Sequence, residues 1–132
     1  MKRLVYLVLG AAMILTPCAS RASKKVAFQG QDWLDAQSDP AAVNVDGRWS
    51  AKGWGVIILH QMRGSRQVSG TSDSWDFTGV VSGKKVYLII STSGFVVYSA
   101  ILTSASDSEL SGTYERGLMK EEGKGRRMDL TK

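Results

Sequence analysis

The residue types that most often carry enzymatic or metal chemistry are sparse in this chain. His60 is the single histidine, and it ends an apolar run that begins at Val56. A lone histidine makes a metal site only with carboxylates or thiols beside it, and the sequence shows no such spacing. Serines are abundant, but no nucleophile-elbow motif accompanies them. The sequence therefore predicts a non-enzymatic protein without a metal or other cofactor, and a hydrolase that uses His60 is the least favoured alternative.

The acidic residues gather in turns. Asp73 and Asp76 flank Trp75, and Glu121 is followed directly by Glu122. Turn neighbours do not supply the carboxylates that face each other across the cleft of a glycosidase. The chain also lacks a phosphate-binding loop and a dinucleotide fingerprint. The mixed charges of residues 120–127 indicate a solvated hairpin tip, with docking of a polyanionic envelope component as the alternative.

Residues 1–22 have the composition of an export signal. Lys2 and Arg3 precede an uncharged run from residue 4 to residue 15, which is followed by Pro17, Cys18 and small residues. That run is too short for a membrane span of about 20 apolar residues, whereas its length suits a signal peptide. We therefore expect an exported protein that is periplasmic or secreted.

Two cleavage sites compete within this segment. Ser20-Arg21-Ala22 offers small residues where a signal peptidase cleaves, and the favoured product is a soluble protein that begins near Ser23. The alternative is a membrane-anchored lipoprotein, because residues 15–18 resemble a bacterial lipobox in which Cys18 becomes the lipidated first residue. Pro17 departs from that motif, which has Gly, Ala or Ser before the cysteine.

Removal of residues 1–22 also changes the charge argument. The whole chain has 17 Lys and Arg against 12 Asp and Glu, a net charge of +5 with a pI near 9.5. Lys2, Arg3 and Arg21 belong to the signal, so 14 basic and 12 acidic residues are left, a net charge of +2. We therefore expect no nucleic-acid partner.

From residue 46 to the end, the chain has the alternation of half-buried strands. Short clusters of Gly, Ser and Asp separate the strands, and strands joined by such tight turns must be antiparallel neighbours. We predict an all-β fold: an antiparallel meander of about eight strands that closes into a small up-and-down barrel, which removes exposed edges. The side chains predicted to point inward are Val68, Phe77, Val81, Leu110, Tyr114, Met128 and Leu130.

Residues 23–45 are predicted to be a lead-in segment before the barrel domain of residues 46–132. Residues 31–36 can form a short helical turn that ends before Asp39-Pro40. A helix this short is stable only if Trp33 and Leu34 dock on the barrel. We expect Trp33 to cap an open barrel end rather than to stack on a ligand.

Residues 86–90 and 95–102 break the alternation because they are apolar on both faces. One of these faces must be covered by something outside the barrel interior. The Trp33 region, a second copy of the chain and a partner protein are all candidates, with self-association slightly favoured. The predicted interface residues are Tyr87, Ile89, Val96 and Tyr98. A structural or accessory subunit that self-associates through residues 86–102 is the corresponding alternative function.

Four aromatic residues are candidates for a ligand site at the mouth of the barrel: Trp49, Trp54, Trp75 and Tyr114. In the alternative, they pack the core or close one end. The leading functional hypothesis is an exported binding protein for a small apolar ligand or for a protein partner in the cell envelope.

The opening strand resembles that of the calycin superfamily, the lipocalins and avidins, through Gly47-Arg48-Trp49. That resemblance implies that Trp49 packs at the closed end of the barrel beneath a basic residue from near the last strand, for which Arg126 and Arg127 are candidates. The repeated Val-Ser-Gly and Leu-Ser-Gly phrases are similar to those of many small exported bacterial barrels. The polar pocket of avidin is not recognisable after Trp49, so the resemblance implies no biotin site.

Overall fold

The structure is a computed structural model, and it describes residues 30–132. The predicted export signal of residues 1–22, including Cys18, lies outside the described residues, and so does the start of the lead-in segment. Residues 30–132 contain no helix that is both long and apolar enough to cross a membrane.

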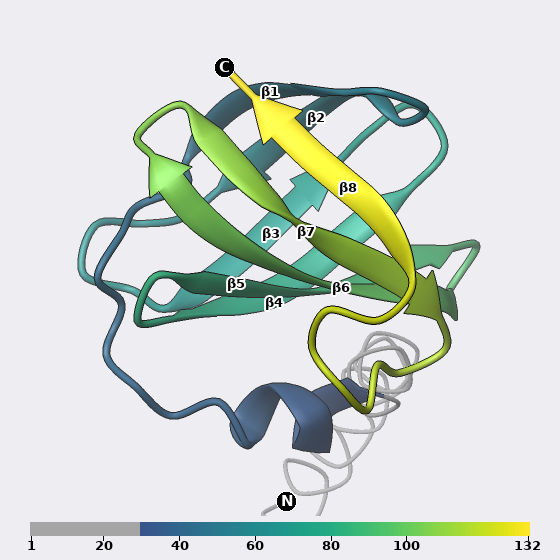
Figure 1. Ribbon diagram of the computed structural model, residues 1–132, viewed down its shortest axis with the longest axis horizontal. Helices are drawn as coiled ribbons and strands as arrows, with labels where there is room; N and C mark the ends of the chain where they lie inside the picture. The colour runs from purple at the N-terminus through teal and green to yellow at the C-terminus, as the bar shows by residue number, and fades with distance from the viewer. Residues whose placement is uncertain (1–29) are drawn as a thin grey trace, which may run out of the picture.

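Eight strands form a closed barrel in which every strand pairs antiparallel with its neighbours in sequence and β8 pairs with β1 (Figure 1). The strands are β1 (Gly47–Ala51), β2 (Gly55–His60), β3 (Gln67–Thr71), β4 (Asp76–Ser82), β5 (Lys85–Thr92), β6 (Phe95–Ser106), β7 (Glu109–Arg116) and β8 (Arg126–Thr131). The predicted all-β meander and its closure are confirmed. The described part of the lead-in adds a short helix at residues 30–35, which is called the lead-in helix below.

The middle of the barrel is filled by side chains. Alternate residues of each strand point inward, and the fully buried ones include Ile57, Leu59, Phe77, Leu88, Ile90, Leu102, Leu110, Met128 and Leu130. The predicted inward set is confirmed, except that Tyr114 is only half-buried. Gly79 permits close strand contact, because a Cβ there would collide with the backbone oxygen of Tyr87.

One end of the barrel is closed by Trp49. Its side chain is 1% exposed, and its indole Nε1 donates a hydrogen bond to the Val45 carbonyl at 2.9 Å. The ammonium of Lys132 lies 4.9 Å from the ring centroid and donates to the Asp46 carbonyl at 3.1 Å. A cation therefore does cover this tryptophan, as the calycin resemblance implies.

The choice of Arg126 or Arg127 as that cation was wrong. β8 runs towards the closed end, so Arg126 and Arg127 at its start lie far from Trp49. Lys132, which follows the last residue of β8, lies beside Trp49. Arg127 instead pairs with Asp129 at 3.0 Å.

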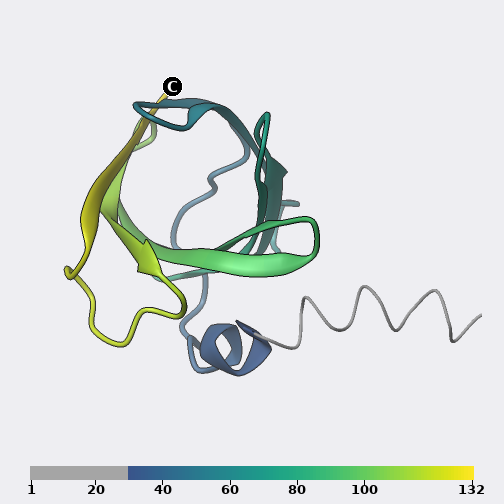
Figure 2. The same ribbon diagram turned by 90° about the vertical axis from the view of Figure 1, so that its right-hand side faces the viewer.

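The lead-in chain crosses the closed end, which is the far end in the view along the barrel of Figure 2. The buried Gln61 holds it there: Gln61 Oε1 accepts from Val45 N at 2.8 Å, and Gln61 Nε2 donates to Val43 O at 3.3 Å. A buried amide satisfied on both sides fixes this segment across the opening.

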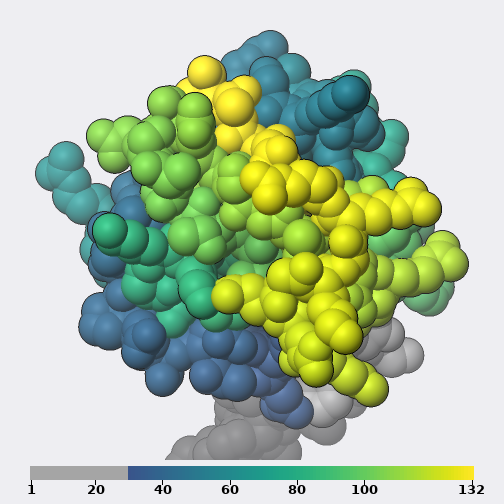
Figure 3. Space-filling view, viewed as in Figure 1, coloured from purple at the N-terminus to yellow at the C-terminus, as the bar shows by residue number. Residues whose placement is uncertain are grey.

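The outer face of β5 and β6 is covered by the lead-in helix and by the loop of residues 117–125, which lie side by side (Figure 3). Leu34 is buried, and the Trp33 ring meets the Tyr87 ring edge-on at 5.6 Å. The Trp33 indole donates to Met119 O at 2.9 Å, and Met119 N donates to Ser99 Oγ at 2.7 Å. Trp33 and Leu34 thus dock on the barrel as predicted, but Trp33 packs on its side and does not cap an end.

The lead-in helix thus covers Tyr87 and Ile89 within the single chain, and self-association through residues 86–102 stays a prediction. Of the three candidates for covering this face, the Trp33 region is the one that lies on it, and Ile89 is 3% exposed within the single chain. Met119 packs the start of the 117–125 loop on this face, whereas residues 120–127 are exposed, as their mixed charges predict.

A β-bulge in β6 places Val96 and Tyr98 on opposite faces of the sheet, although strict alternation predicts them on the same face. Ile90 pairs with Tyr98 and Ser91 pairs with Val96, so Val97 is an extra residue in β6. An extra residue reverses the alternation. Tyr98 therefore shares the inner face with Ile90, while Val96 lies on the outer face with Ser91, and the predicted interface set is split.

We expect Trp49→Ala to lower the free energy of unfolding by about 3–5 kcal/mol, because it empties a buried site and removes an indole hydrogen bond. Urea denaturation measures this loss. Arg48→Ala, at the exposed neighbouring position, is the matched control and should change stability by less than about 0.5 kcal/mol. Equal stability of the Trp49 variant and the wild type would contradict the end-closing role.

Replacement of Ser99 by Ala should cost about 1–3 kcal/mol, because the buried N–H of Met119 loses its acceptor. The same change should speed tryptic cleavage at Lys120 and Lys124 by loosening the loop. Ser69→Ala, at an exposed strand position, serves as the control. Unchanged cleavage of the Ser99 variant would show that this hydrogen bond does not hold the loop.

Candidate functional site

Four half-buried aromatic side chains meet at the end of the barrel opposite Trp49. Trp54 is their centre: its ring lies 5.7 Å from Trp75, 5.8 Å from Tyr98 and 5.1 Å from Tyr114, in edge-to-face geometry. Tyr98 also contacts Trp75 at 5.5 Å and Tyr114 at 5.4 Å. We call these four residues the aromatic cluster. The buried Phe77 lies beneath it, 6.3 Å from Trp54.

The turns and strand ends at this end of the barrel place the cluster. Trp54 sits in the β1–β2 turn between Gly53 and Gly55, both of which have positive φ angles. Trp54 N donates to Ala51 O at 3.0 Å, which closes the turn. Trp75 ends the β3–β4 turn, whereas Tyr98 and Tyr114 project from β6 and β7. Glycine tolerates these backbone angles where other residues are strained, so the turn aims Trp54 at the barrel mouth.

A hollow of about 420 Å³ adjoins the cluster. It is lined by Tyr98, Tyr114, Glu115, Arg116, Gly125 and Arg126. The two tyrosines give it an apolar wall, and the two arginines give it positive charge. Aromatic walls with a few polar groups are typical of small-ligand sites. We refer to the aromatic cluster and this hollow as the open end.

The structure brings together three of the four predicted ligand residues. Trp54, Trp75 and Tyr114 meet at the open end, but Trp49 lies at the closed end, buried beneath Lys132. In place of Trp49, Tyr98 completes the cluster. Local alternation predicts Tyr98 in the outer interface, because it does not reveal the bulge at Val97.

The predicted interface residues do not form one surface. Tyr87 and Ile89 lie under the lead-in helix, where a Cβ on Gly30 would collide with the Ile89 side chain. Val96 is half-buried, and its neighbour Phe95 is 69% exposed at the β5–β6 hairpin. The large apolar side chains left exposed on this side are therefore Phe95, in the hairpin at the rim of the open end, and Leu118.

His60 is exposed at the end of β2, on the closed-end side of the barrel and away from the aromatic cluster. It lines a hollow of about 500 Å³ together with Met62, Gln67 and two residues of the lead-in helix, Gln31 and Leu34. In residues 30–132, no group of three His, Cys, Asp or Glu side chains is placed to hold a metal ion. The surroundings of His60 supply no observation that favours a hydrolase.

Ion pairs involve several charges in and around the 117–125 loop. Lys85 Nζ lies 2.7 Å from Glu122, and Lys124 lies 3.3 Å from Glu121. The hydrogen bond to Glu122 is the main cause that raises the pKa of Lys85. The hydrogen bond from Arg127 chiefly lowers the pKa of Asp129. These pairs are exposed, so each contributes little to stability.

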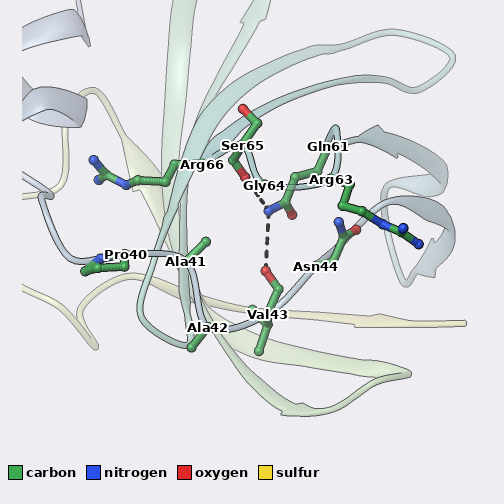
Figure 4. A pocket seen from close by; sticks show the side chains of 10 residues that line it. All are labelled: Pro40, Ala41, Ala42, Val43, Asn44, Gln61, Arg63, Gly64, Ser65 and Arg66. Atoms are coloured by element: carbon green, nitrogen blue, oxygen red, sulfur yellow. Dashed lines mark hydrogen bonds between the residues drawn. The ribbon is translucent and has the colours of Figure 1, made fainter.

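A second hollow, of about 700 Å³, lies at the closed end between residues 40–44 and residues 63–66 (Figure 4). The Gln61 amide bridges its two walls through Val43 O and Ser65 O. The guanidiniums of Arg63 and Arg66 point away from each other in this view. The polar groups of Gln61 are thus engaged in holding the lead-in chain.

Comparison of the chain with known protein families, with curated proteins and with solved structures finds no match.

Trp54→Ala should lower the free energy of unfolding by about 2 kcal/mol, since it removes several aromatic contacts that are each worth about 0.5–1.5 kcal/mol. The loss should be smaller than that for Trp49→Ala, because Trp54 is only half-buried. Urea denaturation of both variants measures the difference. If Trp54→Ala lowered the free energy of unfolding as much as Trp49→Ala, the aromatic cluster would be a buried core rather than a half-exposed surface.

Proposed function

We propose that this protein is a non-enzymatic binding protein that takes a small apolar ligand on the aromatic cluster at the open end of its barrel. The observation that carries the proposal is the cluster itself: Trp54 and the three half-buried aromatic rings around it, beside a hollow, at the end that the lead-in chain does not cross. Large aromatic groups in a concave surface bind apolar molecules by burying area on both partners.

The filled interior determines where such a ligand sits. Phe77, Leu88 and Met128 are each at most 1% exposed and occupy the lumen below the cluster. An apolar ligand therefore rests on the rim and displaces water from the rings. The Gly-x-Trp of the first strand, with Lys132 over the ring, supports a calycin-like barrel.

The sequence supports export as the setting for this function. The composition of residues 1–22 favours cleavage near Ser23 and a periplasmic or secreted protein, with a lipid anchor at Cys18 as the alternative. The net charge of +2 after cleavage gives no support to a nucleic-acid partner.

A protein partner at the hairpin rim is the second candidate function. Phe95 is 69% exposed and Leu118 is 37% exposed, so this side offers two large apolar side chains to a partner. A second copy of the chain or an envelope protein that covered Phe95 would make this protein an accessory subunit. Native mass spectrometry distinguishes the two: a dimer that Phe95→Ser dissociates favours the subunit, and a monomer with a retained small molecule favours the carrier.

The ligand proposal is tested with the neutral fluorescent probe N-phenylnaphthylamine. We expect saturable binding to the wild type and at least about tenfold weaker binding to Trp54→Ala, since tenfold corresponds to about 1.4 kcal/mol. Trp33→Ala is the matched control, because it removes a half-buried tryptophan from the outer face. Circular dichroism confirms that each variant is folded. An absence of saturable binding, or equal loss in both variants, would overturn the proposal.

A further inference from the structure

Two arginines share the inner face of the barrel with the two tyrosines of the aromatic cluster. In the β6–β7 ladder Tyr98 lies opposite Arg116, and in the β7–β8 ladder Tyr114 lies opposite Arg126. Residues directly opposite each other project from the same face of a sheet, as do residues two apart along one strand. Tyr114 and Arg116 are two apart in β7, so all four side chains belong to one inward-facing group at the rim.

These arginines are not used in ion pairs within the barrel. In the described part of the chain, neither guanidinium lies within salt-bridge distance of a carboxylate, whereas the nearby Arg127 pairs with Asp129. Glu115 also lines the hollow, but it lies opposite Ser99, whose side chain faces outward to Met119. The inner side of the hollow therefore carries two cations beside two aromatic rings.

The backbone fixes the position of Arg126. Gly125 has a φ of 98°, and a Cβ at this position would collide with the carbonyl oxygen of Tyr114. The 117–125 loop can therefore approach the end of β7 this closely only with glycine at its last residue. The approach sets Arg126 directly across from Tyr114 at the start of β8.

We propose that the open end selects anionic ligands: small amphipathic molecules whose apolar part lies on Tyr98 and Tyr114 and whose single carboxylate, sulfonate or phosphate is bound by Arg116 and Arg126. Guanidinium groups bind such planar or tetrahedral anions through two parallel hydrogen bonds. The aromatic rings supply affinity for the apolar part, and the arginines orient the ligand. This inference rests on the proposed function, since it names the class of ligand that the same site takes.

The test uses two probes that differ only in charge. N-Phenylnaphthylamine is neutral, and anilinonaphthalene sulfonate has the same rings with an added sulfonate. We expect the sulfonate to bind the wild type at least about fivefold more tightly at low salt, with the preference falling as salt is added. In the double variant Arg116→Gln with Arg126→Gln, the preference for the sulfonate, measured as the ratio of the two affinities, should vanish.

The control is the double variant Arg48→Gln with Arg63→Gln, which removes the same charge from exposed positions at the closed end. It should keep the preference for the sulfonate. If the neutral probe binds and the sulfonate binds no better, or if both double variants lose the preference equally, the inference fails while the proposed function stands. If neither probe binds to the wild type, both fail.

Discussion

The whole structure depends on closure of the sheet between β1 and β8, which is its shortest seam. Only two register pairs join these strands, Ser50 with Thr131 and Ala51 with Leu130, whereas six join β7 and β8. Trp49 and Lys132 reinforce the seam, because the lysine extends from the chain end to the Asp46 carbonyl across the tryptophan ring. Trp49 and Lys132 thus add contacts between β1 and the end of β8, where few backbone hydrogen bonds join the two strands.

Closure at one end explains why the other end is free to bind. The lead-in chain and Gln61 cross the Trp49 end, so the aromatic rings at the opposite mouth are left half-exposed. The outer face of β5 and β6 is covered in a similar way, which leaves Phe95 of the hairpin and Leu118 of the 117–125 loop as the exposed large apolar side chains on that side. The aromatic cluster and Phe95 thus lie at one rim, where Arg116 and Arg126 add positive charge, while Met62 is exposed near the closed end.

Local patterns in the sequence predict most of the fold but only part of the site. Period-two alternation identifies inward positions such as Phe77 and Met128, because each depends only on neighbours along its own strand. The role of Lys132 depends on where the last strand ends relative to the first, which no local pattern contains. The placement of Tyr98 depends on one extra residue, Val97, in a run that is apolar on both sides. Long-range register, rather than composition, decides both cases.

Hydrogen exchange of the four indole N–H protons, followed by NMR, tests most directly whether the barrel has one closed and one open end. The indoles of Trp49 and Trp33 donate to Val45 and Met119 carbonyls, so their protons should exchange slowly, Trp49 the slowest. The protons of Trp54 and Trp75 should exchange fast and should be the two whose signals shift when an apolar probe is added. Protection of Trp54 equal to that of Trp49 would contradict this account, because both ends would then be closed.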